Sequence, residues 1–294
     1  MTPPSPTRSL RSVTDADLPQ TDGDRESFVL RPTVWAGGAS DVGLRHTPNQ
    51  DALALAAGTA VDGSLIAVCC VSDGVSTSAH AEDASALAVE TACSHVAEVL
   101  RANPLPLDVA GTIIDAFAQA NSHVTQAAGS APAGTWACTL VVSVAWHNRV
   151  TVGSIGDSRC YWLPDEGTPR TLSTDDSVAQ AQIDLGVTRE RAETSSGAHA
   201  ITKWLGPGSH TVRPSLQAVD ITTPGWLLTC SDGLWNYASH AADMAEVVNS
   251  AVADSKTGDD DPAAWQVCAA LVDWANERGG HDNIAVSLVR LKPT

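Results

Sequence analysis

Four aspartates stand where short apolar runs, read as buried strands, begin or end. Asp73 follows LIAVCCVS, Asp157 follows VGSIG, Asp232 follows WLLTCS, and Asp282 immediately precedes the last apolar run. A carboxylate at such a place costs free energy unless a partner offsets its charge. Carboxylates gathered at one edge of a sheet repel one another, and oxygen ligands of this kind suit Mg²⁺ or Mn²⁺. The pattern therefore predicts a site for divalent cations.

Each of these positions also has a simpler interpretation. An Asp-Gly pair after a strand is commonly a hairpin turn. However, Asp73-Gly74 and Asp232-Gly233 are followed by stretches of helical composition, so both pairs leave a sheet rather than reverse within it. Asp157 could be a turn residue paired with Arg159. Asp51, a fifth candidate, closes the polar string 43–51 before another apolar run. The absence of a His and Cys cluster at metal spacing argues against zinc.

The apolar patterns predict the elements that must position these side chains. Runs rich in Val, Ile, Leu, Trp and Thr predict strands at residues 64–72, 140–146, 149–155, 159–163, 225–231 and 283–291. Apolar residues at helical spacing predict helices at residues 81–101, 107–126 and 263–278. A close connection at His147-Asn148 favours a hairpin and antiparallel pairing. Helices grouped between clusters of strands predict layered α+β architecture rather than a βαβ winding.

The composition limits the class of partner and the cell compartment. The 17 Lys and Arg against 34 Asp and Glu give a net charge of −17, which repels nucleic acid and anionic membrane surfaces. The seven cysteines form no Cys-x-x-Cys pair and read as reduced, buried thiols. No signal core or membrane span is evident, so we expect a cytoplasmic protein. We expect residues 1–28 to be a flexible leader and residues 29–294 to be a single domain.

Five short motifs around the aspartates occur in a fixed order. They are NQD at residues 49–51, SDG at 72–74, GDSR at 156–159, SDG at 231–233 and GHDN at 280–283. This order resembles the protein phosphatase 2C family of metal-dependent Ser/Thr phosphatases, in its compact bacterial form. The resemblance runs from about residue 35 to 291. It implies a four-layer αββα sandwich, in which two antiparallel sheets are flanked by helices and the metal site lies at one end.

The resemblance also implies roles for individual residues. Asp51 and Asp73 would hold a pair of Mn²⁺ or Mg²⁺ ions with Asp73 bridging them. The Gly74 carbonyl would bind the second ion, Asp232 and Asp282 would complete the first, and Asp157 with Asp232 would support a third, looser ion. A hydroxide bridging the ions would then attack phosphorus in line. The implied substrate is a phosphoserine or phosphothreonine protein made by a Ser/Thr kinase, and we expect the enzyme to be a monomer.

Two positions depart from the family pattern. Family members place an arginine five residues before the position of Asp51 to bind the substrate phosphate, whereas this chain has His46, with Arg45 beside it. We expect one of these two side chains to bind phosphate, and a loop histidine without a role is the alternative for His46. The second departure is Val75 and the residues after it, where relatives carry a glycine pair or a histidine. Residues 177–200 match a mobile flap in the family, or form a solvated surface helix.

These departures keep two other functions open. The chain could be a catalytically weak relative that acts as a regulatory or binding module. It could also hydrolyse a small phosphorylated metabolite instead of a phosphoprotein.

Overall fold

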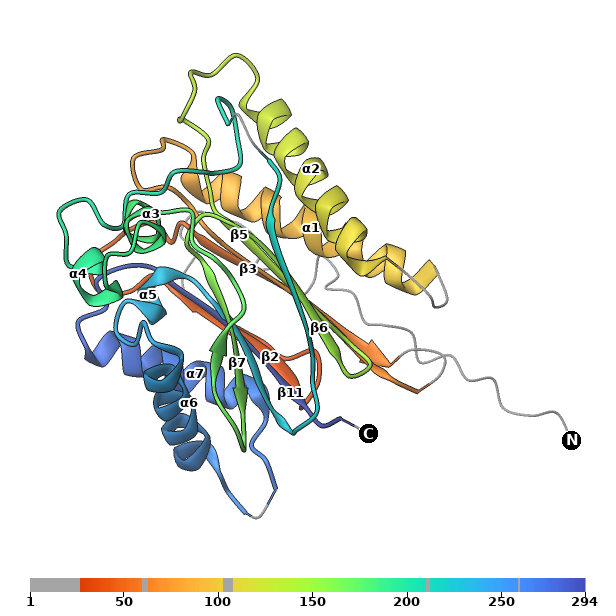
Figure 1. Cartoon of the computed structure of the whole chain (residues 1–294). Coiled ribbons are helices and arrows are strands. Elements are labelled where there is room, and N and C mark those ends of the chain that lie inside the picture. The colour runs from red at the N-terminus through yellow and green to blue at the C-terminus, as the bar shows by residue number, and fades with distance from the viewer. Residues whose placement is uncertain (1–26, 60–62, 103–107, 210–211, 259, 294) are drawn as a thin grey trace, which may run out of the picture.

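The computed structural model describes residues 27–59, 63–102, 108–209, 212–258 and 260–293, and these form two antiparallel sheets packed face to face (Figure 1). The first sheet has the strand order β3 (Asp51–Thr59), β4 (Leu65–Asp73), β5 (Leu140–Trp146), β6 (Arg149–Ile155) and β9 (Ser215–Asp220). The second has the order β1 (Phe28–Leu30), β2 (Ala36–Asp41), β11 (Ile284–Leu291), β10 (Gly225–Cys230), β7 (Arg159–Pro164) and β8 (Arg170–Thr171).

Helices cover the outer face of each sheet (Figure 1). The first sheet carries α1 (Ala81–Ala102) and α2 (Val109–Ala128), and the second carries α6 (Ala241–Ser255) and α7 (Ala264–Glu277). Three short helices lie near one end of the sandwich: α3 (Val178–Asp184), α4 (Arg189–Glu193) and α5 (Asp232–Trp235). The predicted α+β fold of four αββα layers is confirmed.

Three apolar layers hold these elements together. One lies between α1, α2 and the first sheet, one between the two sheets, and one between the second sheet and its helices. Strand β4 contributes to two of these layers, which explains why its sequence is a continuous apolar run rather than an alternating one. All seven cysteines are free and buried in these layers. Burial raises the pKa of Cys69, Cys138 and Cys160 to about 12, so these thiols stay protonated.

The predicted strands and helices agree with the observed ones to within about two residues at most ends. Strand β2 was not predicted, because its sequence AGGASD is rich in glycine and lacks β-branched residues. The structure gives the reason for Gly37, since a Cβ there would lie 2.4 Å from the backbone nitrogen of Trp265 in α7. Strands β1, β3, β8 and β9 and helix α6 were not predicted either, whereas α5 lies at Asp232-Gly233, where the sequence indicated a stretch of helical composition.

The predicted leader falls mostly outside the described residues, which begin at residue 27. Phe28, placed in the leader, already pairs with Ser40 of β2. Within the described part of the chain, no helix has both the length and the apolar character that crossing a bilayer requires.

Candidate metal centre

Two of the predicted ligands meet in the first sheet. Strand β3 begins at Asp51, strand β4 ends at Asp73, and these two residues lie directly opposite each other in the antiparallel register. The backbone of Asp73 is fixed by Thr139, whose Oγ1 accepts from the Asp73 N–H at 2.9 Å and whose own N–H donates to the Asp73 carbonyl at 2.8 Å. The pairing of two strands therefore brings together two carboxylates that are 22 positions apart in the sequence.

The second sheet supplies two more aspartates at the same end. Strand β10 ends at Cys230, which pairs with Val286 of β11. Asp232 after β10 and Asp282 before β11 therefore lie at the same end of the second sheet. The Ser231 hydroxyl donates to Asp51 Oδ2 at 2.5 Å and so connects this end of the second sheet to the first sheet. The two sheets therefore present their aspartates toward a shared site.

The charges of these carboxylates act on one another. Burial raises the pKa of Asp73 well above its ordinary value, and repulsion from Asp51, Asp232, Asp157 and Asp282 raises it further. The pKa of Asp232 is raised to about 7, first by burial and then by the charge of Asp282. Burial is also the largest cause of the raised pKa of Asp51, and Asp232 and Asp282 add to it. The cluster is thus costly to charge without cations.

Asp157 lies in the turn between β6 and β7 and is only 4% exposed. Its pKa is raised by burial first and then by Asp232 and Asp175, while Arg159 lowers it. The ion pairs of Arg159 are instead with Asp175 at 2.7 Å and Glu193 at 3.3 Å. The alternative in which Asp157 and Arg159 form a simple turn pair is therefore not the arrangement observed.

The donor set fits hard divalent cations. Asp232 Oδ1 is buried and has no hydrogen-bond partner, as expected of an oxygen that serves as a metal ligand. No three His, Cys, Asp or Glu side chains among the described residues come together as a ready coordination shell. Mg²⁺-type ions keep several waters and need only one or two carboxylates each, so this spacing agrees with them better than with a closed zinc site. The roles predicted for the individual aspartates and for the Gly74 carbonyl stay predictions.

The predicted phosphate-binding residues, His46 and Arg45, lie at the exposed rim of the candidate metal centre. His46 Nε2 is 3.9 Å from Asp282 Oδ1, and both side chains are partly exposed, at 43% and 37%. Arg45 is exposed on the same loop. Their part in binding phosphate stays a prediction.

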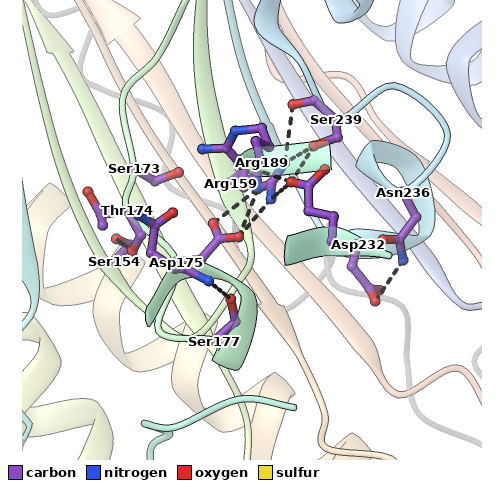
Figure 2. Close-up of polar contacts among 12 residues, drawn as sticks. Ser154, Arg159, Ser173, Thr174, Asp175, Ser177, Arg189, Asp232, Asn236 and Ser239 are labelled. Atoms are coloured by element: carbon purple, nitrogen blue, oxygen red, sulfur yellow. Dashed lines mark hydrogen bonds and ion pairs between the residues drawn. The ribbon is translucent and has the colours of Figure 1, made fainter. Parts of the chain in front are cut away.

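A buried polar network beside the candidate metal centre was not predicted from the sequence (Figure 2). Arg159 of β7 donates to Asp175 through Nε at 3.0 Å and Nη2 at 2.7 Å, and through Nη1 to Ser239 Oγ at 3.0 Å. It also reaches Glu193 of α4 at 3.3 Å. The GDSR motif marks Arg159 in the sequence, but no local pattern indicates its partners, since Ser239 is 80 residues further along.

A cavity of about 540 Å³ opens next to this network. Its walls include Glu190 and Glu193 from α4, Trp235 from α5, and the predicted metal ligand Asp282. The cavity therefore adjoins the predicted reaction site.

Comparison with known proteins agrees with this arrangement. The family model described as protein phosphatase 2C matches residues 44–271. The serine/threonine phosphatase stp of Listeria innocua is 30% identical over 152 residues, which cover 51% of this chain and 55% of that protein. Protein phosphatase PhpP of Streptococcus pneumoniae is 31% identical over 154 residues, covering 52% and 57%. The matched region thus spans about half the length of these curated relatives.

Solved structures match over more of the chain. The Mycobacterium tuberculosis serine/threonine phosphatase PstP/Ppp has a TM-score of 0.70 at 25% identity, covering 87% of this chain and 98% of that one. The catalytic domain of PstP in complex with two manganese ions has a TM-score of 0.66 at 24% identity, covering 90% and 100%.

Proposed function

The chain belongs to the protein phosphatase 2C family, and from this premise we propose that it is a metal-dependent protein Ser/Thr phosphatase. The observation that carries the proposal is the meeting of aspartates from both sheets at one end of the sandwich, where Asp232 Oδ1 is buried without a hydrogen-bond partner. The substrates would be phosphoserine and phosphothreonine in proteins, as the relatives' names indicate.

The ligand assignment follows the order of the motifs. Asp51 and Asp73 would share a pair of Mn²⁺ or Mg²⁺ ions, with Asp232 and Asp282 completing one of them. The Gly74 carbonyl would serve the other ion, and Asp157 a third. When bound, such ions lower the pKa of a coordinated water and offset the charge of the phosphoryl group. The protein's own contribution is to hold the carboxylates in place, since Ser231 fixes Asp51 and Thr139 fixes the backbone of Asp73.

The proposal extends to partners and location. The opposing enzyme would be a Ser/Thr kinase, and the phosphatase would act as a monomer in the cytoplasm. The net charge of −17 makes nucleic acid and anionic membranes poor partners.

The test of the function is Mn²⁺-dependent hydrolysis of an aryl phosphate and of phosphoserine and phosphothreonine peptides. We expect turnover of both kinds of substrate, abolished by EDTA and by Asp232→Ala, because that change removes a metal ligand. Turnover of small phosphorylated metabolites but not of peptides would show that the substrates are small metabolites and not phosphoproteins. If the folded wild-type protein has no metal-dependent turnover, the enzyme proposal is wrong and the regulatory or binding module is the function that remains.

Replacement of His46 by arginine tests phosphate binding at the rim. A guanidinium can bind a phosphate with two parallel N–H donors, whereas a neutral imidazole offers one. His46→Arg should therefore lower the KM for an aryl phosphate by about 3–10-fold and strengthen inhibition by inorganic phosphate. His123→Arg, on the exposed face of α2, adds the same charge away from the site and should leave KM unchanged. An unchanged KM in His46→Arg would show that this position does not reach the phosphate.

A further inference from the structure

The segment that contains α3 and α4 has very little apolar packing of its own. Its apolar cluster consists of three buried alanines, Ala179, Ala192 and Ala198, with Ile183 and Val187 against them. Its backbone closes on itself, because Ala179 N–H donates to the Ala198 carbonyl at 2.9 Å and Val178 N–H to the Ala200 carbonyl at 3.0 Å. Alanine side chains bury little area, so polar contacts must contribute strongly to where this unit sits.

One carboxylate of α4, that of Glu193, contacts residues outside this segment. Glu193 Oε1 accepts from Ser239 Oγ at 2.7 Å, from Arg159 Nη2 at 3.3 Å, and from Arg189 of its own helix at 2.8 Å. These donors lower the pKa of Glu193 despite its partial burial, so the carboxylate stays charged near neutral pH. Hydrogen bonds between charged groups are about twice as strong as neutral ones.

Arg159 joins Glu193 to two other parts of the molecule. Its guanidinium is 3% exposed and binds Asp175 with two nitrogens. Its Cζ lies 3.6 Å from the centre of the Trp235 ring in α5, and Nη1 donates to the carbonyl and hydroxyl of Ser239 between α5 and α6. Figure 2 shows Arg159 between Asp175 and Ser239, with Asp232 close by.

The parts joined by this arginine also form the cavity beside the metal centre. Glu193, Trp235 and Ser239 line it together with Asp282. We propose that Arg159 is a positioning residue which, through Glu193, fixes the α3–α4 segment over this cavity and so favours extended phosphopeptides over small phosphate esters. The part about substrates rests on the proposed function, while the part about position does not.

Hydrogen exchange in the metal-free protein tests the position directly. We compare wild type with Glu193→Gln, which keeps the shape but removes the charge, and with Arg159→Lys, which keeps the charge but loses the planar fork. Amides of α4 should exchange about tenfold faster in both variants, because each loses a charge-assisted contact that opposes local opening. Amides of β4, in the core of the first sheet, should be unaffected in Glu193→Gln.

Arg290→Lys is the matched control. Arg290 also binds two aspartates, Asp165 and Asp261, and lies near a tryptophan ring, but it sits at the opposite end of β11 from Asp282. It should leave α4 exchange unchanged. If α4 exchange is unaltered in Glu193→Gln, or rises no more than exchange in β4, the proposed positioning role is wrong.

The second readout is the ratio of kcat/KM for a phosphothreonine peptide to that for an aryl phosphate. We expect Glu193→Gln to lower this ratio about fivefold through KM, and Arg290→Lys to leave it unchanged. An unchanged ratio would overturn the substrate part of the inference. A wild type without turnover would overturn the proposed function instead, and the exchange result would still decide whether Arg159 positions the segment.

Discussion

Replacement of Asp73 by asparagine should abolish metal-dependent turnover and at the same time stabilise the metal-free protein. Asp73 faces Asp51 across two strands, and its charge is opposed by four neighbouring carboxylates as well as by burial. Loss of this ligand removes several kcal/mol of charge stabilisation from the reaction, so kcat/KM should fall by about 10³-fold or more.

The stability effect has the opposite sign because the raised pKa makes the charged form of Asp73 unfavourable in the folded state. At pH 8, Asp73→Asn removes that charge, and the midpoint of thermal unfolding in EDTA should rise, by about 2–4 °C for each kcal/mol gained. In wild type, Mn²⁺ at a hundred times its Kd should add about 2.7 kcal/mol, and the variant should lose most of this gain.

The control is Asp220→Asn, which removes an equal charge from an ion pair with Arg149 whose side chains are 72% and 56% exposed. Exposed pairs contribute little, so its stability and turnover should stay close to wild type. Differential scanning calorimetry with and without Mn²⁺, together with turnover, measures each quantity. If Asp73→Asn has the same turnover as wild type, Asp73 is not a metal ligand.

Replacement of Gly233 by alanine should damage both stability and activity although it adds only one methyl group. A Cβ at residue 233 would lie 2.0 Å from the backbone carbonyl oxygen of Asn283, so backbone must move. Gly233 directly follows Asp232 in the sequence, and Asn283 directly follows Asp282. The side-chain oxygen of Asn283 also accepts from the N–H of Gln50 at 2.8 Å, and Gln50 directly precedes Asp51. The displacement would therefore reach three predicted metal ligands.

The expected cost is about 1–3 kcal/mol of folding free energy from overpacking, and about a 10²-fold loss in kcat if the ligands shift by roughly 1 Å. Gly258→Ala is the matched control, because a Cβ at that glycine meets no atom within 4 Å. Urea unfolding and Mn²⁺-dependent turnover measure both effects. Normal activity in a folded Gly233→Ala protein would show that this contact does not position the aspartates.

Much of the candidate site was predictable because its signals are local. An apolar run that ends in Asp-Gly identifies a buried strand and a carboxylate at its end, and Asp73 and Asp232 were placed in this way. The long helices and central strands were predictable for the same reason, since burial of one face imposes a short repeat on the sequence. Strand β2 was missed because its glycines are required by close neighbours that are distant in the sequence, Trp265 at Gly37 and Leu53 at Gly38.

The sequence by itself determined which residues carry charge at strand ends, and the order of the motifs determined the family. Only the tertiary structure decided which of those charges face one another. Asp51 meets Asp73 through strand register, and Ser231 reaches Asp51 across the two sheets over a separation of 180 residues. Arg159 of β7, Glu193 of α4 and Ser239 from the connection between α5 and α6 likewise come together. Such contacts depend on how the layers pack, and no short repeat in the chain records that packing.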